Sequence, residues 1–557
     1  MSAVLTAQES SAKYLVNMQP PLVRHFDFIA QAPGGVARLR ELILTLAVQG
    51  KLVPQDPSDE PASELLKKIA LEKDRLVAEK KIRKGKPLLD IGDEEMFFEL
   101  PGSWAWVRLN SIGDWGAGAT PSRTNSNYYG GKIPWFKSGE LTADHIAEPE
   151  ETVTEAALRE CSLRLNQPGD VLIAMYGATI GKTAILDVVG TTNQAVCACT
   201  PFSGMLNSYL LLLMKALKPY FISQGAGGAQ PNISREKIIH TVIGLPPLAE
   251  QSRIVTRVEE LMQLCDALEA SGQLEAQQHA QLVNTLLGTL TQSETPEALA
   301  DNWQRIATHF DVLLDRPEAV DALEQTILQL AVRGLLVPQD PTDEPASVLL
   351  QKIRTEKDHL IAQGKIKRDK PLPPITDDEK PFELPQGWEW ARLNDLIRIG
   401  SGDGLTAAQM APTGTIPVYG GNGVNGHHDQ ANVEEPTLVI GRVGYYCGSV
   451  HITPAKAWVT DNAFITRYPK SYLDMEWLYW LLVGTNLKEN DSATAQPVIS
   501  GRKLYPIVVA LPPHAEQSRI VTRVNELRSL CADLRQRLAA LQSGQKQLAT
   551  ALIENAT

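Results

Sequence analysis

The chain has 557 residues, too many for a single hydrophobic core, so three or four compact units are expected. It contains no run of 18 apolar residues and no signal-peptide pattern, which predicts a cytoplasmic protein without a membrane span. A formal net charge of −12 at pH 7 does not point to nucleic acid, although a local basic face or a basic partner subunit could still contact phosphates.

Residues 1–100 predict a mainly helical region. Apolar residues at helical spacing, including Leu39, Leu42 and Leu46, end at Gly50. A second helix is expected from about 62 to 84, and its outer face is rich in lysine and arginine. Such a face is usually only solvated, but it could also dock DNA backbone or an acidic partner.

The character of the sequence changes after residue 100. Trp104 and Trp106 open a region with short β-like runs, many glycines and few helical periods. Residues 101–247 are therefore expected to form an α+β domain, and residues 385–513, which open with Trp388 and Trp390, form a second one.

Each of these regions is followed by a helix with a heptad pattern. Residues 249–258 and 515–524 are identical in sequence, and both follow a Leu-Pro-Pro. Apolar residues then alternate at spacings of four and three, which is the seam of a coiled coil. The predicted seam residues are Ile254, Val258, Leu261, Cys265 and Leu268 in the first copy and Ile520, Val524, Leu527, Cys531, Leu534, Leu538 and Leu541 in the second. The ready partner of each helix is the other copy.

The identical stretch belongs to a longer internal repeat. His25-Phe26-Asp27 recurs at 309–311 and Glu99-Leu100-Pro101 recurs at 383–385, so these two segments repeat at the same offset. The seam helices repeat at a shorter offset. A unit of roughly 270 residues is thus duplicated in tandem, with similar flanks and a divergent interior. The two domains share one fold whose loops differ.

No motif in the chain supports catalysis. The segment from Gly177 to Thr183 is similar to a phosphate-binding loop, but it has three residues between its glycines where that loop needs four. His427 and His428 have no companion ligand at metal-binding spacing, and the six cysteines show no CxxC pattern. No nucleophile stands beside an evident base, so we expect no catalytic residue, no bound cofactor and no metal on this chain.

The divergent loops contain side chains suited to base edges and phosphates. Arginine reads guanine and asparagine reads adenine through paired hydrogen bonds, while tyrosine and lysine reach phosphates. The predicted DNA-binding residues are Arg123, Asn125, Asn127, Tyr128, Lys137 and Lys182 in the first domain and Asn422, Asn425, His427, His428, Arg442, Tyr445 and Arg502 in the second.

The whole arrangement resembles the specificity subunit of a type I restriction–modification system. The similar segments are residues 46–57, residues 382–388, the Leu-Pro-Pro-x-Ala-Glu-Gln before each seam helix, and the loops around Ile133 and Ile416. The resemblance implies an α+β fold with two target-recognition domains, separated by long antiparallel coiled-coil spacer helices and related by a pseudo-two-fold axis.

On this basis the expected domains are an N-terminal helical region (1–100), target-recognition domain 1 (101–247), a central helical spacer (248–384), target-recognition domain 2 (385–513) and a C-terminal coiled-coil helix (514–557).

The resemblance also implies a function and partners. Each recognition domain would read one half of a bipartite, asymmetric double-stranded DNA site, and the helices would dock two modification (adenine methyltransferase) subunits and, through them, two restriction subunits. S-adenosylmethionine, ATP and Mg are then expected on the partners and not on this chain. The alternative is a two-module scaffold that binds peptides or partner proteins, and an ATPase or hydrolase ranks third.

Overall fold

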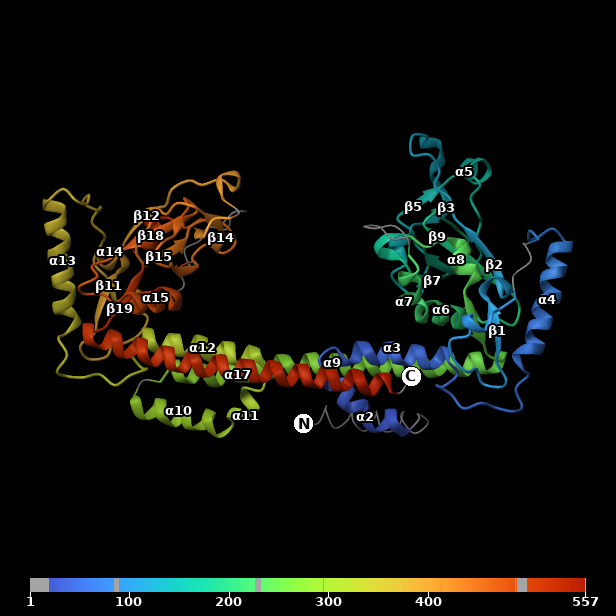
Figure 1. Ribbon diagram of the computed structural model, residues 1–557, viewed down its shortest axis with the longest axis horizontal. Coiled ribbons are helices and arrows are strands. Elements are labelled where there is room, and N and C mark those ends of the chain that lie inside the picture. Colours follow the sequence, from blue (N-terminus) through green and yellow to red (C-terminus); the bar gives the residue numbers. More distant parts are fainter. Residues whose placement is uncertain are drawn as a thin grey trace. The chain divides into compact units, whose positions relative to one another are not determined.

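The computed structural model in Figure 1 describes residues 20–84, 90–225, 232–293, 295–411, 413–485, 487 and 498–555. The chain divides into two compact units: unit 1 comprises Met1–Glu275 with Gln542–Thr557, and unit 2 comprises Ala276–Leu541. Each unit contains one α+β domain and parts of two long helices, α9 (Leu248–Thr291) and α17 (His514–Glu554). Among the described residues, no helix is both long and apolar enough to cross a membrane.

The helical part of unit 1 contains α2 (Pro20–Gln31), α3 (Gly35–Val48), α4 (Ala62–Ala78), the first part of α9 and the end of α17. Arg40 of α3 pairs with Asp266 and Glu269 of α9 at 2.6 and 2.8 Å. On the same helix, Arg38 donates a hydrogen bond to the carbonyl of Lys546 in α17 at 3.0 Å. Helix α3 therefore lies beside both long helices and shares one buried cluster with them.

The first α+β domain stands on this helical base. Its strands are β1 (Ala105–Arg108), β2 (Gly113–Ala117), β3 (Tyr129–Phe136), β4 (His145–Ile146), β5 (Glu151–Val153), β6 (Val171–Ala174), β7 (Thr183–Leu186), β8 (Thr191–Thr192), β9 (Val196–Pro201) and β10 (Val242–Leu245), and its helices are α5 (Glu155–Glu160), α6 (Asn207–Ala216), α7 (Lys218–Ser223) and α8 (Arg235–His240). They form a five-stranded sheet in the order β2-β9-β6-β7-β4, a three-stranded sheet β5-β3-β8, and the antiparallel pair β1-β10.

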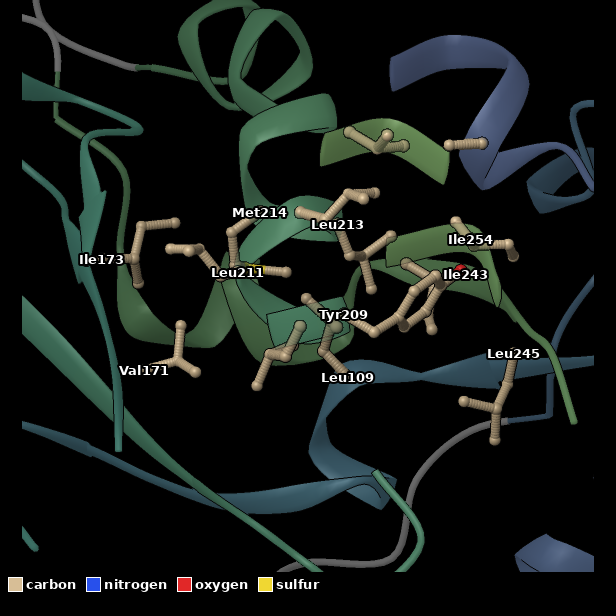
Figure 2. Close-up of a cluster of buried hydrophobic side chains, with 14 of the residues drawn as sticks. Leu109, Val171, Ile173, Tyr209, Leu211, Leu213, Met214, Ile243, Leu245 and Ile254 are labelled. Atoms are coloured by element: carbon tan, nitrogen blue, oxygen red, sulfur yellow. The ribbon is translucent and has the colours of Figure 1, made fainter. Parts of the chain in front are cut away.

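Helix α6 joins the large sheet to the helical base. Figure 2 shows Tyr209 and Leu213 of α6 between Ile173 of β6, Ile243 of β10 and Ile254 of α9. All five side chains are buried. Burying a leucine or isoleucine side chain contributes about 1.5–3 kcal/mol, so this cluster fixes the domain on the start of α9.

Unit 2 repeats this plan. It contains the end of α9 and most of α17. Its other helices are α10 (Pro296–Thr308), α11 (Phe310–Leu313), α12 (Pro317–Val332), α13 (Ala346–Ala362), α14 (Leu393–Leu396), α15 (Met475–Gly484) and α16 (Gly501–Leu504). Its strands are β11 (Glu389–Arg392), β12 (Arg398–Ser401), β13 (Ile416–Gly420), β14 (Gly423–His428), β15 (Leu438–Gly441), β16 (Val450–Ile452), β17 (Trp458–Val459), β18 (Ala463–Arg467) and β19 (Val508–Leu511). The sheet orders β12-β18-β15-β16 and β14-β13-β17 match β2-β9-β6-β7 and β5-β3-β8 of the first domain, and the edge strand β4 has no counterpart among the described residues of the second. The predicted duplication of one α+β fold is therefore confirmed in strand order.

The length difference between the two domains lies mainly in one connection. Between β3 and β6 the chain runs through residues 137–170, and this segment contains β4, β5 and α5. The equivalent connection from β13 to β15 covers residues 421–437 and is half as long. In the shorter version, β14 follows β13 directly as a hairpin and takes the edge position that β5 holds in the first domain.

The seam helices have an additional partner that the heptad pattern did not indicate. In unit 2, Arg535 and Arg528 of α17 pair with Glu324 of α12, the counterpart of α3. The end of α9 and the first part of α17 also share a buried cluster there, while the first part of α9 and the end of α17 share one in unit 1. Each heptad face therefore packs on a repeat of α3 as well as on the other long helix. Leu541 was predicted in the seam, but it is 64% exposed.

Candidate nucleic-acid interface

Five of the predicted binding residues of the first domain surround its three-stranded sheet. Arg123, Asn125 and Asn127 lie on the segment that leads into β3, and Lys137 follows the end of that strand. Tyr128 donates a hydrogen bond to Glu160 of α5 at 3.0 Å, and the side chain of Asn125 accepts one from the backbone N–H of Asn127 at 3.1 Å.

The two cations in this group are bound to carboxylates of the same domain. Arg123 pairs with Glu151 of β5 at 2.5 Å, and Lys137 pairs with Glu150 and Glu151 at 2.7 and 3.1 Å. Hydrogen bonds from Arg123 and then Lys137 lower the pKa of Glu151 from 4.5 to about 2, so this carboxylate is ionised at neutral pH. The guanidinium of Arg123 also lies over the ring of Tyr129, 4.5 Å from its centroid. The group is thus nearly neutral and held in place, and it does not form an open basic patch.

Lys182 lies elsewhere in the first domain. It precedes β7 and is half-buried, and the segment Gly177–Thr179 forms a short helical turn between β6 and β7. These two strands are antiparallel neighbours. A phosphate-binding loop connects a strand to a helix instead, so the topology gives a physical reason against the ATPase reading.

In the second domain, two loops bring the predicted residues together. Asn422 lies at the turn between β13 and β14, and Asn425, His427 and His428 follow on β14. The hydroxyl of Ser449 donates a hydrogen bond to the carbonyl of Gly421 at 3.1 Å, which ties this turn to the loop after β15. A Cβ added at Gly421 would lie 2.4 Å from the carbonyl oxygen of Val443, so the two loops approach each other too closely for a larger residue.

The loop after β15, residues 442–449, carries Arg442 and Tyr445. Arg442 donates a hydrogen bond to the carbonyl of Asp461 at 3.3 Å and lies over the ring of Phe464 at 5.5 Å. Its own carbonyl accepts a hydrogen bond from the N–H of Ile499, which leads directly into α16 and the exposed Arg502. Asn422, Arg442, Tyr445 and Arg502 therefore belong to adjoining segments of one domain.

A set of functional residues that the sequence analysis did not assign lies in the repeated Ala-Glu-Gln-Ser-Arg motif. The fully buried Glu250 accepts a hydrogen bond from Gln55 at 2.7 Å, and the buried Gln251 accepts one from the N–H of Leu206 at 2.9 Å. Arg253 pairs with Asp59 at 2.6 Å. These three contacts tie α9 to the loop before α4 and to the segment before α6.

The second copy makes equivalent contacts. Glu516 accepts a hydrogen bond from Gln339, the counterpart of Gln55, at 3.4 Å and another from the indole N–H of Trp388 at 3.1 Å. Gln517 accepts one from the N–H of Asp474 at 2.8 Å, and Arg519 pairs with Asp343 at 2.5 Å. Burial raises the pKa of both Glu250 and Glu516. Because the Glu, Gln and Arg of each copy have partners on different elements, positioning of the recognition domains on the helices explains why these three residues are the same in both copies.

Within the described parts of the chain, no group of three or more metal-ligating side chains could hold a metal ion. Two segments that belong to the duplicated pattern, 226–231 and 488–497, lie outside the described residues.

Sequence similarity to known proteins points to one family. The family model for the type I restriction modification DNA specificity domain matches twice, at residues 101–277 and 385–542. The chain is 36% identical to the type I restriction enzyme EcoAI specificity subunit of Escherichia coli, with 94% of each chain covered. It is also 36% identical to the EcoEI specificity subunit of the same organism, again over 94% of each. A crystal structure of the HsdS subunit from Thermoanaerobacter tengcongensis is 18% identical, covers 83% of this chain and 98% of that chain, and superposes with a TM-score of 0.39.

Two domain matches that together span more than half of the chain, and relatives of this similarity over nearly the full length, establish the family. The chain belongs to the type I restriction–modification specificity subunits and carries two copies of their DNA specificity domain.

Proposed function

We propose that each α+β domain reads one half of a bipartite, asymmetric DNA site and that the long helices dock two adenine methyltransferase subunits and, through them, two restriction subunits. The chain itself is the specificity component of a type I system and not its catalytic part. In this assignment S-adenosylmethionine, ATP and Mg act on the partner subunits.

One observation carries the proposal of two half-sites. The same frame is built twice, with equal strand order and equal anchors, while the connections that carry the predicted binding residues differ. A frame that is held constant while its loops change presents different side chains to DNA from the same position. Two different half-sites require this arrangement.

The exposed faces of the long helices support the docking of partner subunits. Leu274 of α9 and Leu548 of α17 are 48% and 52% exposed in unit 1. In unit 2, Leu530 is 64% exposed beside an apolar groove of about 520 Å³ lined by side chains of α10, α12 and α17. Exposed leucines along a helix are suited to a partner that brings an apolar helical face of its own.

The net charge of −12 fits a subunit that does not act alone on DNA. Phosphate contacts supply most of the affinity of DNA-binding proteins, and an acidic chain repels the duplex. We therefore expect the isolated chain to bind DNA weakly and to gain affinity once basic partner subunits enclose the duplex.

A domain graft tests the proposal. Residues 385–513 are replaced by the equivalent domain of another specificity subunit, and the methylated motif is read by methylation-sensitive sequencing of the host genome. We expect one half of the motif to change and the other half to stay. A simultaneous change in both halves would contradict independent reading by two domains.

A further inference from the structure

The loop after β15 presents two aromatic side chains to solvent. Tyr445 is 80% exposed and Tyr446 is 51% exposed, and Tyr445 is the most exposed large side chain among the described apolar and aromatic residues. The two rings contact each other edge to face, with centroids 5.0 Å apart and an interplanar angle of 85°. Two adjacent exposed tyrosines contribute little buried apolar surface to the fold. Their exposure therefore indicates a role in binding and not a role in folding.

The base of this loop is closed by backbone hydrogen bonds. Gly448 donates its N–H to the carbonyl of Gly441 at 2.8 Å, and Cys447 donates to the carbonyl of Gly444 at 2.9 Å. The side chain of Cys447 is fully buried and holds the loop against the domain. Gly444 and Gly448 have φ angles of +98° and +85°, which residues with a Cβ rarely adopt. The tyrosine pair is therefore held outward by a fixed turn, and ordering it on a ligand would cost little entropy.

The surroundings of the pair are polar and suited to DNA. The loop adjoins the turn that carries Asn422, and Arg442 lies at its start. The equivalent loop of the first domain, between β6 and β7, makes the same backbone turn from Gly177 to Gly181 and has Ala178 and Thr179 at these positions. The aromatic pair is thus a property of the second domain and not of the shared frame.

We propose that Tyr445 and Tyr446 form an aromatic wedge that stacks on nucleobases at a distorted base step of the half-site read by the second domain. The inference rests on the proposed function. Aromatic rings stack on any base through its π-face, and side chains inserted between base steps stabilise a kinked or unstacked duplex. The wedge would therefore distort the DNA on one half of the site only.

The wedge is tested in the complete complex of this chain with its methyltransferase subunits. A set of duplexes carries the adenine analogue 2-aminopurine at successive positions of the second half-site other than the adenine to be methylated, which a methyltransferase itself flips out of the stack. Its fluorescence rises where stacking is lost. We expect an increase at one step with the wild-type complex. Tyr445→Ala and the double variant with Tyr446→Ala should abolish the increase and weaken specific binding roughly tenfold to a hundredfold.

Substitution by phenylalanine separates stacking from hydroxyl contacts. Tyr445→Phe keeps the ring, so it should keep the fluorescence signal and bind within about threefold of wild type. Equal losses in the phenylalanine and alanine variants would assign the residue to a phosphate contact and overturn the wedge. Tyr220→Ala, which removes an exposed tyrosine of the first domain, is the matched control and should leave the signal unchanged.

Four further outcomes decide the proposal. A wild-type complex that binds its site without any fluorescence increase, or an increase that survives Tyr445→Ala, would overturn it. Loss of methyltransferase co-purification in the alanine variant would assign the pair to a protein partner and would also overturn it. Failure of the wild-type complex to prefer its own motif over a scrambled duplex would reject the proposed function itself, and this measurement is made first.

Discussion

The two recognition domains differ in how their loops hold polar and aromatic side chains, although their frames agree in detail. Phe98 and Trp106 lie with ring centroids 4.9 Å apart in the first domain, and Phe382 and Trp390 repeat that distance in the second. The buried Arg108 pairs with Glu95 at 2.7 Å, and its counterpart Arg392 pairs with Glu379 at 2.9 Å. The frame has therefore kept side-chain contacts, and not only backbone topology, through the duplication.

The loops show the opposite behaviour. In the first domain, the candidate cations Arg123 and Lys137 are neutralised by Glu150 and Glu151. In the second, the loop after β15 presents an exposed tyrosine pair, which the equivalent loop after β6 lacks. The comparison teaches that packing fixes the frame, because each buried contact has few substitutes, while exposed loops can change without loss of stability.

Truncation after residue 295 should have the largest effect on this comparison. The fragment keeps the first domain and α9 but loses the end of α17, whose Ala549 and Ile553 share the core of unit 1. In unit 2 the equivalent surface is shared with Val283 and Leu287 of α9, which the fragment retains. We therefore expect a homodimer in which the end of α9 from a second copy replaces the missing helix, measured by light scattering.

With methyltransferase subunits, the same fragment should direct methylation to a symmetric site built from the first half-motif, because both recognition domains of the dimer are then identical. Genome methylation sequencing provides the readout. A well-folded monomer, or methylation that still maps to the asymmetric motif, would refute the expectation.

The duplicated arginines should come next in effect. Arg392 is 5% exposed and donates to the carbonyls of Pro373 and Pro506 as well as to Glu379. Arg392→Met leaves these acceptors without a donor and should lower the free energy of unfolding by about 3 kcal/mol. Arg108→Met should act similarly in the first domain, and urea denaturation followed by tryptophan fluorescence measures both. A lower free energy of unfolding in only one of the two variants would show that the frames are not energetically equivalent.

This ion pair also predicts a dependence on pH. Hydrogen bonds from Arg392 and from the backbone of Thr376 lower the pKa of Glu379 from 4.5 to about 2. A lowered folded-state pKa stabilises the protein above pH 4.5, and the contribution is lost as the pH falls from about 4.5 towards 2. The acid sensitivity of unfolding should therefore be weaker in Arg392→Met than in the wild type over this range.

The buried glutamines of the repeated motif test the anchoring of each domain on its helix. Gln251→Ala removes the acceptor for Leu206 and the donor to the carbonyl of Gly204, and should cost about 2 kcal/mol. Gln517→Ala removes the equivalent bond to Asp474 and should cost about as much. The exposed Gln263 of α9 serves as the control and should tolerate alanine within about 0.5 kcal/mol. Thermal unfolding of the three variants provides the comparison.

The smallest expected effect concerns the neutralised cations of the first domain. Glu151→Gln releases Arg123 and leaves Lys137 paired with Glu150 alone, so the complex should bind DNA about threefold more tightly at low salt and show a steeper salt dependence. Glu148→Gln removes the same charge from an exposed position outside this cluster. Equal gains for both variants would show that net charge, and not the released cations, controls the affinity.

The sequence by itself determined the duplication, the two α+β domains, the long helices and the family. These features are encoded locally or repeated in order: the heptad spacing defines α9 and α17, the Leu-Pro-Pro marks where they begin, and the paired tryptophans mark the first strand of each domain. The expected helix over 62–84 ends earlier, at Ala78, because helix ends depend on contacts as well as on composition.

Only the tertiary structure decided what packs on the seams and which loop residues are available. The heptad pattern shows that a helix has an apolar face, but it does not show that α3 and α12 cover part of that face, because the partners are distant in sequence. The same reason explains Arg123: its pairing with Glu151 joins residues 28 positions apart through the β3–β5 pairing, which no local pattern contains. Burial and charge neutralisation are properties of neighbours in space, so they followed from the fold and not from the order of residues.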